Sequence, residues 1–195
     1  IPHTKHPWSA GYVAKGFTRM KEKLEDFTGN KITDEKLREA IDLCNQEREL
    51  LKEISLMRKS KRPPISTKDF IMLNHASLVV DKKVVVEKLK EIAAGLKETE
   101  GPEVKGPRIM LMGTTMAYGD HRILDFIEAA GGTTVIEEFG EGIRHYWETV
   151  NPEGDLMEAL ADRYFTRRIP PAWFRPGHER QEFAVKLAKE FEVEG

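Results

Sequence analysis

The chain has 195 residues, of which 39% are hydrophobic and 33% charged, and its formal net charge is −2 with a pI of about 6.4. This composition is typical of a globular protein that buries a core. The near balance of charge gives no reason to expect nucleic acid or an anionic membrane as a partner, and no apolar run is long enough to cross a bilayer. The single cysteine, Cys44, excludes an intramolecular disulfide and argues against a thiolate metal site within the chain. A reducing cytoplasm is the expected compartment.

Residues 1–107 are predicted to be helical. Apolar residues at helical spacing predict a helix over residues 9–27. Its expected apolar face consists of Tyr12, Val13, Phe17, Met20, Leu24 and Phe27. Gly29 ends this helix, and Thr33 is the expected cap of a second one that runs to about residue 60. The expected apolar face of the second helix consists of Leu37, Ile41, Cys44, Leu51 and Ile54.

Two more helices are predicted after the break at Pro63 and Pro64. Ser66 and Asp69 have the capping-box pattern for a third helix that ends near residue 78. Asp81 is placed to cap a fourth helix, whose apolar face is Val85, Leu89, Ile92 and Leu96. Residues 99–107 have the composition of a linker.

The pattern changes at Arg108. The apolar run 109–112 predicts a buried strand, and residues 133–137 predict a second one. The helix between them is expected to carry Ile123, Phe126, Ile127 and Ala130 on one face. This β-loop-α-β order is typical of parallel sheets. Further helices are predicted over residues 156–165 and 178–191.

The sequence therefore predicts an α/β fold in which a helical region, residues 1–107, packs on an incomplete Rossmann-like parallel-sheet lobe, residues 108–195. Residues 192–195 resemble the approach to a third strand, and the chain does not begin with Met. We therefore expect truncation at both ends. Missing strands would leave an unusually large apolar surface, which predicts self-association or pairing with another chain.

The loop 113–120 follows the first strand and is the first candidate site. Ligands of open α/β sheets bind beyond the carboxyl ends of the strands. Backbone N–H groups of Gly113, Thr114 and Thr115 are therefore candidates to face a phosphate or thioester oxygen. The sequence is neither a Walker A loop nor a GxGxxG motif. An ordinary βα turn is the alternative.

The second candidate follows the second strand. Glu137 or Glu138 is a candidate catalytic acid, base or hydrogen-bond acceptor, and Arg144 is suited to a carboxylate or phosphate. An internal Glu–Arg ion pair is the alternative. Because adjacent parallel strands end at one edge of the sheet, we expect both loops to meet there. Gly113, Thr114, Thr115 and Arg144 are then the predicted substrate-binding residues.

Other polar and aromatic residues carry weaker signals. Trp173, Phe174 and Arg175 could stack on a ligand or anchor a loop. The histidines lack metal-ligand spacing, so no metal ligand is predicted. Cys44 is expected to be a small core residue.

Several strings in order resemble the benzoyl-CoA reductase and 2-hydroxyacyl-CoA dehydratase family over essentially the whole chain. They are residues 23–33, 45–48, 63–66, 113–120, 125–132, 137–144 and 161–165, together with Arg180. The resemblance implies Rossmann-like lobes, a homologous sister subunit and [4Fe-4S] clusters held by cysteines. It also implies an ATP-dependent activator that donates a low-potential electron, and an acyl-CoA substrate that is reduced at an aromatic ring or dehydrated through a ketyl radical.

The chain departs from that pattern in its cysteines. The resemblance implies that the cluster ligands lie outside residues 1–195, and the cysteines that many relatives have near Phe139 and Pro171 are absent. Residues 1–195 alone are therefore expected to be inactive. The missing cysteines and residues 169–176 favour the reductase over the dehydratase. A non-catalytic assembly domain and a phosphate-binding protein without redox chemistry are the alternatives.

Overall fold

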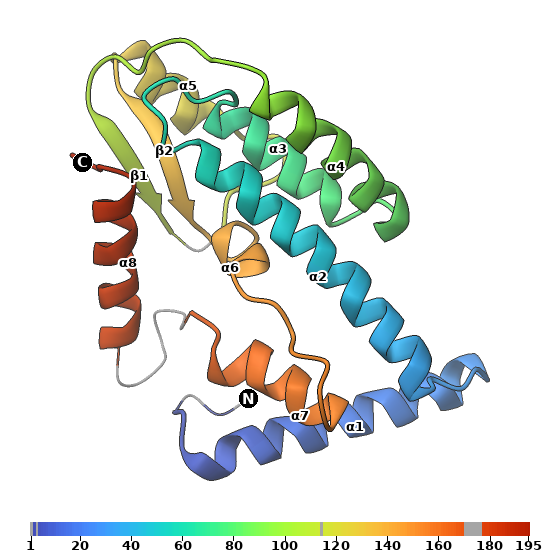
Figure 1. The fold of residues 1–195 in the computed structure, drawn as a ribbon. Coiled ribbons are helices and arrows are strands. Elements are labelled where there is room, and N and C mark those ends of the chain that lie inside the picture. Colours follow the sequence, from blue (N-terminus) through green and yellow to red (C-terminus); the bar gives the residue numbers. More distant parts are fainter. Residues whose placement is uncertain (1, 3, 114, 170–176) are drawn as a thin grey trace.

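The computed structural model describes residues 2, 4–113, 115–169 and 177–195. The first part contains the helices α1 (Pro7–Thr28), α2 (Asp34–Met57), α3 (Thr67–Ser77) and α4 (Lys82–Lys97). The second part contains β1 (Arg108–Met112), α5 (Arg122–Ala129), β2 (Thr133–Glu138), α6 (Ile143–Tyr146), α7 (Leu156–Ala161), the π-helical turn η1 (Asp162–Thr166) and α8 (His178–Glu190). The sheet lies at one end of the molecule and α1 at the other, and α2 runs between them (Figure 1).

The predicted helix ends are confirmed by the hydrogen bonds of the capping residues. Thr33, Ser66 and Asp81 each accept a hydrogen bond from a backbone N–H in the first turn of the helix that follows. These bonds satisfy amides that have no partner within the helix. Gly29 ends α1 in the left-handed conformation, with φ of 70°.

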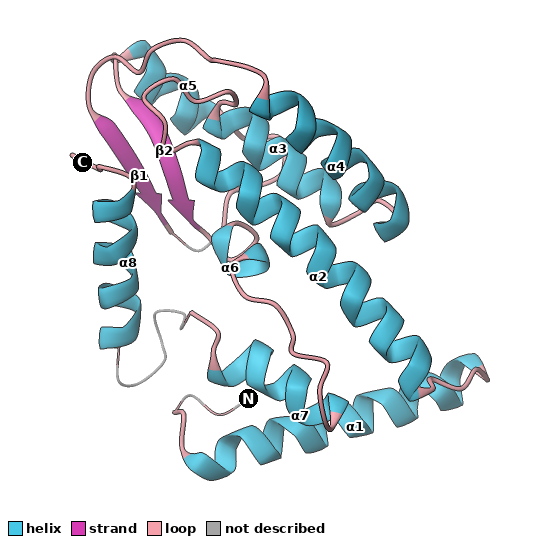
Figure 2. Cartoon of the chain, viewed as in Figure 1, coloured by secondary structure: helices cyan, strands magenta, loops and turns pink. Residues whose placement is uncertain are grey.

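The two strands are parallel, as the β-loop-α-β order predicts. Arg108 pairs with Thr133 and Met112 with Glu138, so both strands end at the same edge. Figure 2 shows both arrows pointing toward α6. On the other side of β1, the Met110 N–H donates to the Gly195 carbonyl oxygen at 2.9 Å. The α/β class is thus confirmed as helices around a small parallel sheet.

One hydrophobic core joins the two predicted regions. Leu51 and Ile54 of α2 lie in the same buried cluster as Ile136 of β2, Tyr146 of α6 and Leu187 of α8, and all five are fully buried. The sheet is therefore covered by α2 from the first region and by α8 from the second. Among the described residues, no helix is both long and apolar enough to span a bilayer.

The predicted apolar face of α1 is buried only in part: Val13 and Phe17 are half-buried, and Phe17 packs against Tyr164. α1 packs against α7 with Ala14 buried, whereas Tyr12 is 61% and Phe27 is 89% exposed. The reason is that α7 covers only the side of α1 on which Ala14 lies. The large apolar surface expected from missing strands, and the self-association expected from it, stay predictions.

α5 also buries a different residue from those expected. Leu124 is buried at 1% exposure, whereas Ile123 and Phe126 are 48% and 69% exposed. The helix is only 8 residues long, so a single side chain anchors it to the core. The helix predicted over residues 156–165 is present as α7 followed by the π-helical turn. α6 was not predicted, because four residues give too little periodicity to detect.

The turn before β1 provides a test of this arrangement. Gly106 and Gly154 both have φ of 74°. A Cβ added at Gly106 would lie 2.0 Å from the Gly131 carbonyl oxygen, whereas one added at Gly154 would meet nothing within 4 Å. We expect Gly154→Ala to lower the free energy of unfolding by about 1 kcal/mol, the cost of the left-handed conformation. Gly106→Ala should cost about 2–4 kcal/mol because the clash is added. Equal losses in urea unfolding would show that this turn is not tightly packed.

Candidate active site

The candidate site lies at the carboxyl edge of the sheet, where β1 continues into residues 113–121 and β2 into residues 139–142 and α6. The Gly113 N–H donates to the Glu138 carbonyl oxygen at 3.2 Å, which extends the strand pairing by one residue. An added Cβ at Gly113 would lie 3.3 Å from the Phe139 ring. The two strand-end loops are therefore in direct contact.

Glu138 is bound by two arginines at this edge. Arg144 Nε donates to Oε1 at 2.6 Å, and Arg180 Nη2 donates to Oε2 at 2.7 Å. Arg144 Nη2 also donates to the Gly113 carbonyl oxygen at 2.7 Å. The Glu138 side chain is fully buried, and the side chains of Arg144 and Arg180 are 6% and 19% exposed. One carboxylate thus holds two guanidinium groups beside the loop of β1.

Glu137 points to the other face of the sheet, since successive side chains of a strand alternate. Its Oε2 accepts a hydrogen bond from Arg58 Nη1 of α2 at 2.7 Å, and its Oε1 accepts one from the Tyr146 hydroxyl at 3.1 Å. Ser55 Oγ lies 2.9 Å from the same hydroxyl and accepts from Arg58 Nη2 at 2.7 Å. Burial, followed by the charge of Glu137, raises the pKa of Tyr146 well above its usual value. This closed network is away from solvent.

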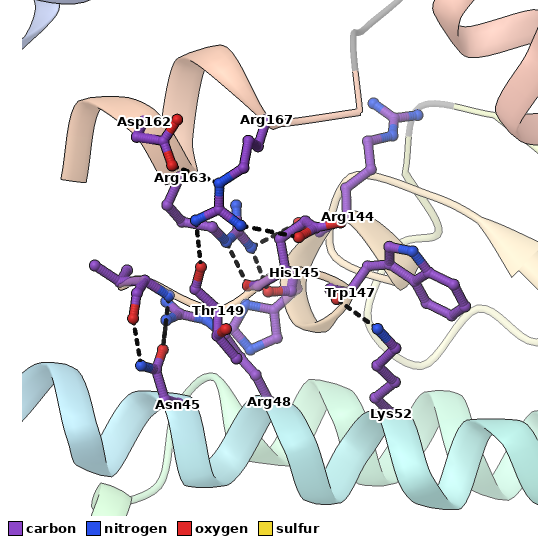
Figure 3. Close-up of polar contacts among 12 residues, drawn as sticks. Asn45, Arg48, Lys52, Arg144, His145, Trp147, Thr149, Asp162, Arg163 and Arg167 are labelled. Atoms are coloured by element: carbon purple, nitrogen blue, oxygen red, sulfur yellow. Dashed lines mark hydrogen bonds and ion pairs between the residues drawn. The ribbon is translucent and has the colours of Figure 1, made fainter. Parts of the chain in front are cut away.

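α6 is held in place by Arg163. The Arg163 guanidinium donates to the carbonyl oxygens of Arg144, His145 and Glu148, and Figure 3 shows it reaching the turn beside Arg167. Burial, together with the positive charge of Arg48, lowers the pKa of Arg163 to about 10. Arg163 therefore fixes the backbone that carries Arg144.

Another buried carboxylate fixes α6 from the side of α2. Glu47 accepts a hydrogen bond from Lys82 Nζ at 2.7 Å, and His145 Nε2 lies 3.6 Å from the same oxygen. Burial alone would raise the pKa of Glu47, but its contacts with His145 and Lys82 hold that pKa below the usual value. Arg144, His145 and Tyr146 thus each contact a different buried carboxylate.

A groove of about 560 Å³ opens beside this edge. Its walls are largely apolar and come from β1, the loop that follows it, α5 and Phe139. The lining residues include Leu111, Gly113, Thr115, Ile123, Phe126 and Phe139. Asp120 and Arg122 also line it, and the Arg122 guanidinium lowers the pKa of Asp120 to about 2. The groove therefore combines an apolar wall with a charged pair.

Three buried polar atoms near the loop 113–121 have no hydrogen-bond partner among the described residues: Asn74 Oδ1, His75 Nδ1 and His121 Nδ1. His75 stacks on Tyr118 with ring centroids 5.6 Å apart. Burial lowers the pKa of His75, and the positive charge of His121 lowers it further, against opposing contributions from Glu141 and Glu137. His75 is therefore held in its neutral form.

Comparison with known proteins gives the family. The 2-hydroxyglutaryl-CoA dehydratase, D-component family matches residues 1–195. The chain belongs to this family. It is 29% identical over 178 residues to the (R)-phenyllactyl-CoA dehydratase beta subunit of Clostridium sporogenes. The matched residues are 89% of this chain and 46% of the relative. It is 26% identical over 181 residues to a provisionally named dehydratase subunit of Escherichia coli K12, YjiM (91% and 47%).

A third relative is a benzoyl-CoA reductase subunit of Thauera aromatica, 24% identical over 161 residues, which are 83% of this chain and 42% of the relative. The chain thus spans slightly less than half the length of each of these proteins. The resemblance seen in the sequence is confirmed at the level of the family, and that family includes subunits of both dehydratases and reductases.

The [4Fe-4S] cluster implied by the family does not fit the residues of this chain. Such a cluster needs several thiolates, and Cys44, on α2, is the only cysteine. Within the described residues, no group of three or more His, Cys, Asp or Glu side chains is placed to hold a metal ion. We therefore assign no step of the chemistry to a cluster held by residues 1–195.

The structure brings together part of the predicted site. Gly113, Glu138 and Arg144 are in contact, and Thr115 lines the adjacent groove. Glu137 faces the opposite side of the sheet, in the network with Arg58. Thr114 and residues 173–175 lie outside the described residues. The binding and catalytic roles of the predicted residues remain predictions.

The sequence interpretation missed the partners Arg58 and Tyr146, and it noted Arg180 only as part of the family pattern. No local signal identifies Arg58 as the partner of Glu137, since the two are 79 positions apart. The string of Glu137, Glu138, Arg144 and Tyr146 does contain matched charges and a hydroxyl. That string could have suggested a buried network, because two adjacent glutamates at the end of an apolar strand need partners.

The stability of the fold should depend on the buried ion pair of Arg58 and Glu137. We expect Arg58→Met to lower the free energy of unfolding by about 3–5 kcal/mol, because it leaves the Glu137 charge buried without its cation. The double variant Arg58→Met, Glu137→Gln should recover part of this loss in a denaturant titration. A single variant as stable as the wild type would show that Glu137 is not buried as a charged group.

The pH dependence of stability should reflect the burial of His75. Its folded-state pKa lies below the ordinary value of about 6.5, so the unfolded chain takes up a proton first as the pH falls. The contribution of neutral His75 to stability is therefore present above about pH 6.5 and declines as the pH falls toward the folded-state pKa. We expect His75→Phe, which keeps the ring stack, to lose less stability than the wild type between about pH 7.5 and 5.5. Parallel stability profiles for the two proteins would contradict this assignment.

Proposed function

We propose that the chain is part of an enzyme subunit that acts on acyl-CoA thioesters, and that the thioester binds at the carboxyl edge of the sheet. The observation that carries this proposal is the contact of Gly113 with Arg144 beside an apolar groove. A CoA thioester has an apolar acyl or pantetheine part and anionic phosphates. The carboxyl edge of the sheet offers an apolar groove and, from α6, the guanidinium of Arg144.

The dimensions and position of the groove support this proposal. Ligand pockets are commonly about 300–1,000 Å³ and largely apolar, with a few polar groups that fix orientation. The groove of about 560 Å³ falls within this range. It also lies beyond the carboxyl ends of parallel strands, where open α/β sheets bind ligands. We accordingly propose that the sheet belongs to a Rossmann-like lobe.

Within the proposed site, Glu138 orients the two arginines and Gly113 lets the ligand approach the backbone. Glu138 is fully buried between Arg144 and Arg180, which favours a positioning role over that of a free base. Glu137 is bonded to Arg58 and Tyr146 on the other face, which favours a role in stability. Thr115, which is exposed in the groove, is the hydroxyl best placed to contact the thioester.

The proposed enzyme uses a [4Fe-4S] cluster whose cysteines lie outside residues 1–195, a homologous sister subunit and an ATP-dependent electron donor. The sequence favours reduction of a benzoyl-CoA-like substrate, with dehydration of a 2-hydroxyacyl-CoA as the alternative. Two of the three relatives carry dehydratase names, which keeps the alternative open. An anaerobic assay of the purified enzyme with its sister subunit and activator decides between them. Loss of a 2-hydroxyacyl-CoA with formation of the enoyl-CoA supports dehydration, and dearomatisation of benzoyl-CoA supports reduction. Turnover of neither substrate favours the non-catalytic assembly domain.

The groove provides the test of binding. Ile123 and Phe126 are 48% and 69% exposed, so Ile123→Asn and Phe126→Ser should leave the melting temperature nearly unchanged. If the groove binds the thioester, each variant should weaken acyl-CoA binding by about threefold to tenfold, because apolar contact is lost. Val79→Asn, at a residue that is 78% exposed outside the groove, is the matched control. Titration calorimetry that gives the same affinity for all four proteins would refute the groove as the binding site.

A further inference from the structure

The surroundings of Glu138 carry an excess of positive charge. Arg144 and Arg180 share this single carboxylate, and both are largely buried. Lys5 pairs with Glu179, the residue before Arg180. These two carboxylates are therefore already occupied by three cations.

Arg168 adds a fourth cation to this group. Lys5 Nζ donates to the Arg168 carbonyl oxygen at 3.4 Å while it pairs with Glu179, so Arg168 lies beside the start of α8. Its side chain is half-buried, and among the described residues its guanidinium has no hydrogen-bond or ion-pair partner. Burial, followed by the positive charge of Arg144, lowers the pKa of Arg168. Arg168 therefore adds a positive charge beside Lys5, Glu179 and the start of α8, the helix that carries Arg180.

An unpaired, half-buried cation next to another cation costs stability, because it is desolvated without compensation. The neighbouring Arg163 and Arg167 show how the fold satisfies such groups elsewhere. Arg163 donates to three carbonyl oxygens, and Arg167 pairs with Asp162 and Glu148. Arg168 has no such partner within the described chain, so its charge is left available for an anion.

We propose that Arg168, together with Arg144 and Arg180, forms a subsite for an oxyanion of the bound CoA thioester. Guanidinium groups bind phosphate and carboxylate oxygens through paired N–H donors. Arg144 and Arg180 both reach the Gly113 carbonyl oxygen, at 2.7 and 3.5 Å, which ties the subsite to the groove. The oxyanion is a phosphate of CoA or a carboxylate of the acyl group. This inference rests on the proposed function, since it names the part of the thioester that the edge recognises.

The test compares Arg168→Gln with the charge-preserving Arg168→Lys and with Arg62→Gln. Arg62 is a surface arginine that pairs with Glu100. It lies at the other end of β1, because its backbone N–H donates to Ser60 Oγ and the side chain of Arg108, the first residue of β1, donates to the Ser60 carbonyl oxygen. Binding of CoA, pantetheine, butyryl-CoA and glutaryl-CoA is measured by titration calorimetry on the purified protein. The melting temperature is measured in parallel.

We expect Arg168→Gln to weaken CoA binding about tenfold, which corresponds to about 1.4 kcal/mol, and to leave pantetheine binding unchanged. Its melting temperature should equal or exceed that of the wild type, because a repulsive charge is removed. Arg168→Lys should retain most of the affinity, and Arg62→Gln all of it. A loss confined to glutaryl-CoA, with butyryl-CoA unchanged, supports the acyl carboxylate as the oxyanion.

Two results would overturn the subsite. One is equal affinity of the wild type and Arg168→Gln for all four ligands. The other is a lower melting temperature with equal losses for CoA and pantetheine, which would show that Arg168 is structural. If the wild type binds none of these ligands, the proposed function itself is wrong. If it binds them and only Arg168→Gln has no effect, the proposed function stands and the subsite alone fails.

Discussion

The fold depends on the burial of two consecutive carboxylates at the end of β2. Glu137 and Glu138 are both fully buried, and a buried carboxylate without a cation costs several kcal/mol. Because strand side chains alternate, the two charges face opposite sides of the sheet and require separate partners. Arg58 of α2 supplies one of these, and Arg144 with Arg180 supply the other. Pairing of these charges therefore fixes α2, α6 and α8 relative to the sheet.

α6 illustrates how these charges specify local structure. A helix of four residues is not stable by itself, because nucleation is unfavourable. Its residues 144–146 are instead fixed by side-chain contacts with Glu138, Glu47 and Glu137, and its carbonyl oxygens accept from Arg163. The helix forms because each of these three residues meets a buried carboxylate. For the same reason, the position of Arg144 is set by the fold before any ligand binds.

The sequence predicted the features that depend on neighbouring residues. The caps at Thr33, Ser66 and Asp81 and the parallel strand pair follow from local patterns, and all were confirmed. The buried side of α1 depends on where α7 docks, and α7 comes much later in the chain, so periodicity alone included the exposed Tyr12 and Phe27 in the predicted face. The partners Arg58 and Arg180 lie 79 and 42 positions from their carboxylates. In the candidate site, the sequence could therefore predict the shared edge but not the partners that occupy it.

Each face of β2 buries a carboxylate that is paired with arginine, but the balance of charge differs between the two faces. On the Glu137 side, charges and hydroxyls are matched in a closed network with Arg58, so this side contributes to stability and has no group left for a ligand. On the Glu138 side, two arginines share one carboxylate beside a groove, and Arg168 is left without a partner among the described residues. Such an excess of charge costs stability. Its presence on the side where the strands end is the physical reason that the proposed thioester site is placed on the Glu138 face.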